Sequence, residues 1–247
     1  MTTVENARSE QLPVPVLDHP HWRVTYRPAT YDEHRIQTLS ECVEIVSKQR
    51  VRLRGWDFPH VPSRNDEMAY GGRWIAGWSD FMGHLEYWRF YQSSQFLYLG
   101  SIREVTDKEW AARLRNTQHF IDRRDISDVP GFLSITNFVY RVTEIFEFAA
   151  RLSQAGIYAE QLEISIKLNN VRGFVLASDP DRMWPNAYAA SESELAFEQV
   201  LTPAELVASA AEAAVNCVVW FFERFGWMKP NISAIKTDQT KLLTRTF

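Results

Sequence analysis

The sequence predicts an α+β fold, with mostly antiparallel strands in one large or two smaller sheets and three long helices packed on them. The composition is that of a globular protein, because 45% of the 247 residues are apolar and 23% are charged. Apolar residues recur at helical spacing in three separate segments, and short alternating runs lie between them. The links between these runs are of hairpin length, which favours antiparallel pairing, since parallel strands need a much longer crossover.

The N-terminal part is expected to be a flexible arm over residues 1–20, which are polar and then rich in proline. A strand follows at Trp22–Tyr26. Thr30 and Glu33 have the spacing of a capping box, in which the hydroxyl and the carboxylate each bond a free amide of the first turn. We therefore expect the first long helix to begin there, with an apolar stripe made by Ile36, Leu39, Val43 and Val46.

Alternating apolar residues then predict four strands, joined by turns at Gly71-Gly72 and Ser93-Ser94. These strands are Val51–Phe58, Trp74–Phe81, Glu86–Gln92 and Phe96–Ser101. A second capping box, Thr106 with Glu109, predicts a short helix that ends near Arg115.

The second half of the chain has the same kinds of element. A long helix is expected from Thr136 to Ala155, where Gly156 ends it. Asn169-Asn170 predicts a hairpin turn, because asparagine tolerates left-handed backbone angles. The strands expected here are Leu162–Leu168, Gly173–Ala177 and Glu194–Leu201. A third capping box, Thr202 with Glu205, opens the last long helix, which runs to Phe225.

A single α+β domain is expected over residues 21–247. Because a helix, three strands and a second helix follow one another twice, two subdomains at 21–115 and 131–247 are an alternative, and the halves could be an internal duplication. The junctions at 104–110 and 199–206 resemble each other. Capping chemistry of this kind is common, so we favour two unrelated junctions over a duplication.

Charge and cysteine usage exclude several classes of protein. A net charge of −4 argues against a nucleic-acid coat and against a polybasic membrane binder. Cys42 and Cys217 form no CxxC pair, so we expect buried free thiols in a reducing compartment. The N-terminus lacks the pattern of a signal peptide, and the most apolar run is about half the length of a membrane span. These features predict a soluble, cytoplasmic protein with no membrane partner.

The least ordinary pattern is the alternation of three arginines with apolar residues in the predicted strand at 51–58. Arg50, Arg52 and Arg54 would line one face, with Trp56 next to them. Guanidinium groups suit phosphate or carboxylate, and a tryptophan ring can stack on a base or a cation. The plainer alternative, which we favour, is an outer sheet face whose arginines pair with glutamates of a helix.

Further mixtures of arginine and aromatic residues would extend this surface. They include Arg73, Trp88 and Arg89. Tyrosine, tryptophan and arginine are enriched at the centres of protein interfaces, and aromatic residues are also ordinary in sheets. The negative net charge favours a protein interface over a nucleic-acid or nucleotide site.

Asp57 and His60 are the candidates for an acid/base pair. Together with Asp66, Glu67, His84 and Glu86 they could also approach a metal ion, but their spacing identifies no metal site. The common phosphate-binding, zinc-protease and nucleophile motifs do not occur. We therefore predict no cofactor and no metal, and leave open whether the chain is an enzyme.

The sequence favours a non-catalytic binding or interaction protein. It would dock a protein partner, or a second copy of itself, or sense a ligand through an arginine–aromatic sheet face. The alternative is an enzyme or receptor for a phosphorylated small molecule or a nucleic-acid end, with Arg50, Arg52 and Arg54 as an arginine clamp.

Overall fold

The computed structural model describes residues 14–63, 67–117, 128–178 and 186–246, and confirms the α+β class. Seven strands form one antiparallel sheet in the order β2-β3-β4-β5-β1-β7-β9. They are β1 (His21–Pro28), β2 (Met68–Tyr70), β3 (Trp74–Phe81), β4 (His84–Tyr91), β5 (Phe96–Ser101), β7 (Leu162–Asn169) and β9 (Glu194–Leu201). Two short strands, β6 (Phe132–Ser134) and β8 (Val175–Ala177), pair in parallel beside it.

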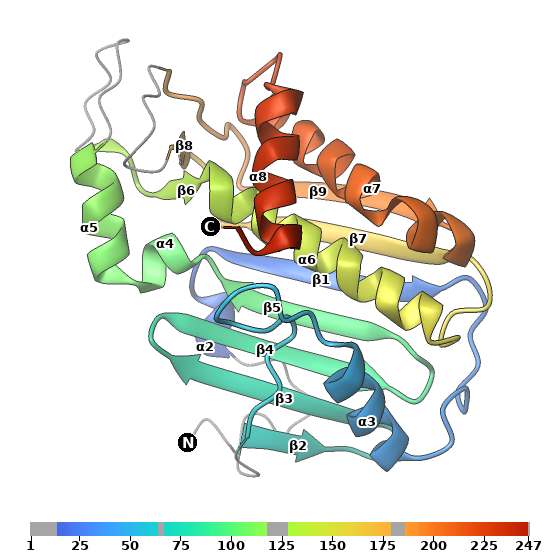
Figure 1. Cartoon of the computed structure of the whole chain (residues 1–247). Helices are drawn as coiled ribbons and strands as arrows, with labels where there is room; N and C mark the ends of the chain where they lie inside the picture. The colour runs from blue at the N-terminus through green and yellow to red at the C-terminus, as the bar shows by residue number, and fades with distance from the viewer. Residues whose placement is uncertain (1–13, 64–66, 118–127, 179–185, 247) are drawn as a thin grey trace.

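Helices cover the two faces of the large sheet unequally (Figure 1). The helices on the front face are α3 (Leu39–Gln49), α6 (Ile135–Gln154), α7 (Pro203–Arg224) and α8 (Ile232–Thr244), while α2 (Val14–Leu17) lies behind the sheet. Side chains of β4 alternate accordingly. Trp88 and Phe90 belong to the large core on the helix side, whereas Leu85 and Tyr87 pack with Val16 on the other side.

The long helix α6 lies at the centre of the core. Its apolar stripe faces the sheet, where Phe138 packs against Trp22 of β1, and the Tyr26 hydroxyl donates to the Ile145 carbonyl at 2.6 Å. Helix α7 packs along α6 and β9. Among the described helices, α7 alone has the length and apolarity of a membrane span, and 44% of that window is buried inside the fold.

The capping boxes have different outcomes. The box at Thr202 and Glu205 is confirmed at the start of α7. The box predicted at Thr30 is wrong, because Thr38 and Glu41 cap α3 instead. Residues 30–37 form an irregular segment, tied down where Arg35 Nη2 pairs with Glu160 Oε1 at 2.5 Å.

The expected helix after β5 is divided into two. Helix α4 (Arg103–Thr106) comes first and α5 (Lys108–Thr117) follows. Asp107 rather than Thr106 caps α5, since its Oδ1 accepts from the Trp110 amide at 3.0 Å.

Several strands lie where the sequence predicts them, and β3, β5 and β9 agree residue for residue. The strand predicted at Val51–Phe58 is wrong. Val51 and Phe58 bond each other in an isolated antiparallel bridge, so the segment is a loop that closes on itself. The hairpin predicted at Asn169-Asn170 is also wrong, because β9 pairs with β7 while β8 pairs with β6.

Both halves of the chain contribute to the one large sheet, in which β1 lies between β5 and β7. The halves differ in arrangement, since β8 of the second half belongs to the small sheet. Residues 14–20, at the end of the expected N-terminal arm, include α2, and its Val16 is fully buried against the sheet. The rest of that arm, residues 1–13, lies outside the described residues.

Candidate functional site

A cavity of about 580 Å³ opens between the sheet, the first turns of α6 and the loop at 54–56. It lies at the end of the molecule where α4, the β3–β4 turn and the start of α6 meet, at the left in Figure 1. Its size is that of a small-molecule site. Aromatic residues from every wall contribute to its lining, namely Trp22, Trp56, Phe81, Tyr98, Phe138 and Tyr140.

One face of α6 supplies the polar wall of this cavity. Asn137, Arg141 and Glu144 are spaced by four and three residues, so they share a face of the helix. Glu144 is fully buried and receives two bonds from Arg54, from Nε at 2.7 Å and from Nη2 at 2.8 Å. A two-point pairing of this kind fixes the guanidinium in one orientation.

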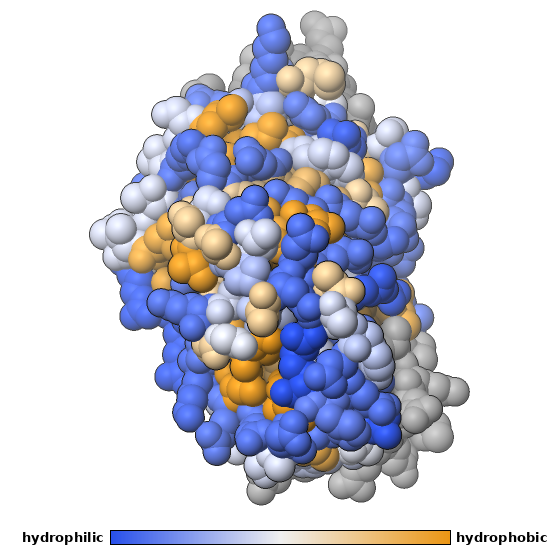
Figure 2. Space-filling view, turned by 90° about the vertical axis from the view of Figure 1, so that its right-hand side faces the viewer, coloured by the Kyte–Doolittle hydropathy of each residue, from blue (hydrophilic) through white to orange (hydrophobic). Residues whose placement is uncertain are grey.

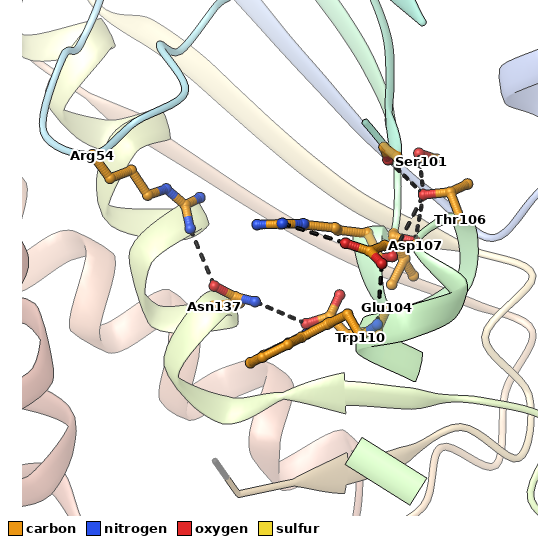
Figure 3. Close-up of polar contacts among 10 residues, drawn as sticks. Arg54, Ser101, Glu104, Thr106, Asp107, Trp110 and Asn137 are labelled. Carbon is orange, nitrogen blue, oxygen red and sulfur yellow. Dashed lines mark hydrogen bonds and ion pairs between the residues drawn. The ribbon is translucent and has the colours of Figure 1, made fainter. Parts of the chain in front are cut away.

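A chain of hydrogen bonds continues from Arg54 across the cavity wall (Figure 3). Arg54 Nη1 donates to the Asn137 side-chain oxygen at 3.2 Å, and the Asn137 amide donates to Glu104 Oε1 at 3.3 Å. The Ser134 backbone amide also donates to Glu104 Oε1, at 3.1 Å. Burial raises the pKa of the Glu104 carboxyl, while these donors favour its ionised form.

Arg141 is bound less completely than Arg54. Its Nη1 lies 3.6 Å from Glu144 Oε2, an ion pair longer than a hydrogen bond. The guanidinium also lies over the rings of Phe58 and Tyr98, at 5.3 and 5.6 Å from their centroids. Within the described part of the chain, Arg141 Nη1 is buried and donates no hydrogen bond.

The sheet side of the cavity contains a second buried carboxylate, Glu86. Its Oε2 accepts from the Tyr98 hydroxyl at 2.9 Å and its Oε1 accepts from the His60 amide at 3.1 Å. Burial raises the pKa of Glu86, and the neighbouring Arg141 opposes that rise. Two buried carboxylates, Glu86 and Glu104, thus line the same cavity as the Arg141 guanidinium.

Trp56 is enclosed by two histidines. Its ring centroid lies 4.0 Å from that of His60 and 4.2 Å from that of His84, and all three planes are nearly parallel. Two imidazoles so close to one ring centre cannot share a face, so both faces of the indole are covered. Trp56 therefore presents an edge to the cavity rather than the free stacking plane that the sequence suggests.

Both histidines that stack on Trp56 have lowered pKa values. Burial lowers the pKa of both rings. For His84 the pKa is about 3, because Arg141, Arg103 and Arg54 add their repulsion to the effect of burial. His84 is therefore neutral at pH 7.

The three arginines of the predicted clamp do not act together. Arg50 and Arg52 both pair with Asp57, at 3.1 and 3.6 Å, and Arg54 alone of the three lines the cavity. The physical reason is the loop at 51–58, in which residues do not alternate between two faces as they would in a strand.

The other predicted surface residues are divided between environments. Trp88 is fully buried on the helix side, where its indole N–H donates to the His60 carbonyl at 2.6 Å. Arg89 faces the other side of the sheet, 4.0 Å above the Trp74 ring. Arg73 forms an ion pair with Glu33 at the surface. These side chains form no continuous face.

Of the predicted acid/base pair, Asp57 is bound by arginines and the His60 ring is stacked on Trp56. The structure places the His60 and His84 rings on opposite faces of Trp56, and the His60 backbone amide bonds Glu86. Within the described ranges, histidine, cysteine, aspartate and glutamate form no group of three or more that could hold a metal ion. Asp66 lies outside those ranges.

Sequence reasoning missed the cavity residues contributed by β5, α4 and α6, namely Tyr98, Glu104, Asn137, Tyr140 and Arg141. One signal was available for α6. Arg141 and Glu144 interrupt the apolar surface of an otherwise buried helix, and charged residues are rarely buried without a partner. No such signal existed for Glu104, because the short helix α4 was not predicted.

With this geometry in view, the chain was compared with known proteins, and no protein-family model, curated protein or solved structure matches it.

Proposed function

We propose that this protein binds one small organic molecule in the cavity beneath α6 and acts as its receptor. The observation that carries the proposal is Arg141, a guanidinium held inside an aromatic cavity with fewer hydrogen bonds than it can donate. An arginine offers five N–H donors, and burying a charge with unused donors costs free energy. A polar ligand in the cavity would supply acceptors for them.

The hydrogen bonds among the polar residues that line the cavity support the same proposal. Arg54, Asn137 and Glu104 are fixed by one another, so their positions do not depend on a ligand. Preorganised polar groups in a mostly apolar pocket are typical of small-molecule sites.

A docking face for a protein partner receives less support. Trp88 and Arg89 belong to opposite faces of the sheet, so the arginine–aromatic surface is divided. On the face shown in Figure 2, which is the right-hand side of Figure 1, hydrophobic residues form separate patches with hydrophilic residues between them. The phosphate clamp is likewise disfavoured, because Asp57 holds Arg50 and Arg52 in ion pairs while Arg54 is bound to Glu144.

The test is equilibrium dialysis against a defined mixture of free amino acids, carboxylic acids, amines, sugar phosphates and nucleotides, with mass spectrometry of what the protein retains. The matched variants are Gly55→Trp and Gly72→Trp. A Cβ atom added at either position meets no atom within 4 Å, but Gly55 lines the cavity and Gly72 lies in the β2–β3 turn.

We expect wild type and the Gly72→Trp variant to retain the same compound and Gly55→Trp to lose it. Retention of nothing, or equal retention by all three proteins, would refute the proposal. The cytoplasmic location expected from the sequence fits a receptor for a metabolite and stays part of the proposal.

A further inference from the structure

We infer that the ligand is a zwitterion on an apolar body, an α-amino acid with an aromatic side chain, with its carboxylate at Arg141 and its ammonium at Glu104. This inference rests on the proposed function. The alternative drawn from the sequence was a phosphorylated ligand, and the balance of charges and hydrogen-bonding groups in the cavity separates the two ligand classes.

With its carboxylates ionised, the site disfavours a strongly anionic ligand. Three guanidinium groups and four carboxylates line the cavity or pair with its arginines, which gives a formal charge of −1. They are Arg54, Arg103 and Arg141 with Glu86, Glu104, Asp107 and Glu144. A doubly charged phosphate would leave the enclosure strongly negative, whereas a zwitterion leaves its balance unchanged.

The donor side of the site is Arg141. Arg54 donates one hydrogen bond from each of its three nitrogens, to Glu144 and Asn137, so its orientation is already fixed. Arg141 has the rings of Phe58 and Tyr98 beneath it and a long ion pair with Glu144. A planar fork of this kind matches a carboxylate.

The acceptor side is Glu104. Its hydrogen bonds from Ser134 and Asn137 both go to Oε1. A carboxylate can accept about four hydrogen bonds, so Glu104 keeps acceptor capacity. Burial raises the pKa of this carboxyl, and an ammonium beside it would stabilise the ionised form.

The two sides lie close enough to interact electrostatically, because the Glu104 carboxylate helps to raise the pKa of Arg141. Asn137, which bonds Glu104, lies one helical turn before Arg141, and four residues of α-helix span about 6 Å. We therefore expect an ammonium and a carboxylate on one carbon to reach both groups. The aromatic lining, including Trp22 and Tyr140, would surround the side chain.

The experiment is calorimetric titration of wild type with three probes that share one ring. These are L-phenylalanine, 3-phenylpropionate, which lacks the amine, and 2-phenylethylamine, which lacks the carboxylate. We expect L-phenylalanine to bind at least about ten-fold more tightly than either analogue, because each loses a charge-assisted hydrogen bond.

Two variants assign the groups. Arg141→Met should weaken L-phenylalanine to the level of 2-phenylethylamine and leave the latter unchanged. Glu104→Gln should weaken it to the level of 3-phenylpropionate. The controls are Arg113→Met and Glu109→Gln, which change two exposed residues of α5 and should leave all three affinities unchanged.

Equal or tighter binding of 3-phenylpropionate by wild type would overturn the zwitterion, and this comparison needs no variant to fold. Binding of none of the three, while the dialysis mixture yields a bound acid or phosphate, would also overturn it and leave the receptor proposal standing. An aromatic amino acid retained from that mixture would support it, whereas an acidic or aliphatic one would overturn the aromatic side chain. Retention of nothing would defeat both.

Discussion

Arg54 and Glu144 lie ninety residues apart and form a two-point ion pair, with Nε–Oε1 at 2.7 Å and Nη2–Oε2 at 2.8 Å. The Glu144 side chain is fully buried and the Arg54 side chain is 21% exposed. The pair joins the loop at 50–60 to the middle of α6. It therefore fixes the rim of the cavity as well as part of its wall.

Glu144→Ala is expected to lower the free energy of unfolding by about 3–5 kcal/mol, because it leaves the charges of Arg54 and Arg141 without their buried partner. Urea denaturation measures the change. The double variant Arg54→Met with Glu144→Leu should recover much of this loss, since it leaves no unpaired charge from that pair.

The control is Glu44→Ala, which removes an exposed pair with Lys48 on α3. Such a pair contributes at most about 0.5 kcal/mol. A Glu144→Ala protein no less stable than the Glu44→Ala protein would show that the buried pair does not stabilise the fold.

His84 should make the protein sensitive to acid. Its pKa is about 3 in the folded protein, against 6.5 for an ordinary histidine. As pH falls below about 6.5, the unfolded chain takes up a proton that the folded protein does not, so the free energy of unfolding falls progressively down to about pH 3. Thermal unfolding followed between pH 7 and pH 3.5 measures this slope.

His84→Gln should flatten the slope, whereas His34→Gln, on an exposed side chain, should not. The raised pKa values of Glu86 and Glu104 act in the opposite direction, since a folded protein that binds their protons more tightly gains stability as pH falls. They are present in both variants, so the difference between the variants isolates His84. Equal slopes would contradict the prediction.

Elements of secondary structure were predictable from the sequence where the residues that determine them lie close together in the chain. Strands β3, β5 and β9 follow from alternation within eight residues or fewer, and the start of α7 follows from one capping box. The loop at 51–58 has the same alternation as a strand, yet no neighbouring strand pairs with it. Whether this segment joins a sheet depends on residues distant in the sequence, which the local pattern does not contain.

The candidate site shows the same limit. The sequence indicates five residues as candidate functional groups, and the structure places all of them at or beside the cavity. They are Arg54, Trp56, His60, His84 and Glu86. Their roles were not predictable, because Arg54 is defined by Glu144 and Trp56 by two histidines from separate segments. Arg50 and Arg54 differ only in which acid each one meets.

Thr202→Ala and Thr38→Ala should each lower the free energy of unfolding by about 1 kcal/mol, because each removes the side-chain acceptor of a complete capping box. Urea denaturation of the single and double variants measures the two changes. The boxes lie on different helices, so the changes should add. Thr237→Ala, in an exposed position within α8, is the control and should not destabilise. A loss of the same size there would show that capping is not the cause.

Gly77→Ala tests the support beneath the cavity. A methyl group added at Gly77 would lie 2.6 Å from the Trp88 ring, closer than real contacts allow. Trp88 is fully buried, so the ring has to move, at a cost of about 1–3 kcal/mol. The movement should disturb the 2.6 Å hydrogen bond from the Trp88 indole to the His60 carbonyl. Because the His60 amide donates to Glu86, the position of the Glu86 carboxylate should change as well.

The expected result is therefore a loss of stability together with weaker binding of the cavity ligand and an altered near-ultraviolet circular dichroism signal. Gly72→Ala is the matched control, because its added methyl group meets no atom within 4 Å. Trp88→Phe separates the two effects, since it relieves the contact but leaves the His60 carbonyl without its donor, which costs about 1–3 kcal/mol. If Gly77→Ala lowers stability while ligand affinity stays at the wild-type value, Trp88 supports the fold and does not position His60 and Glu86.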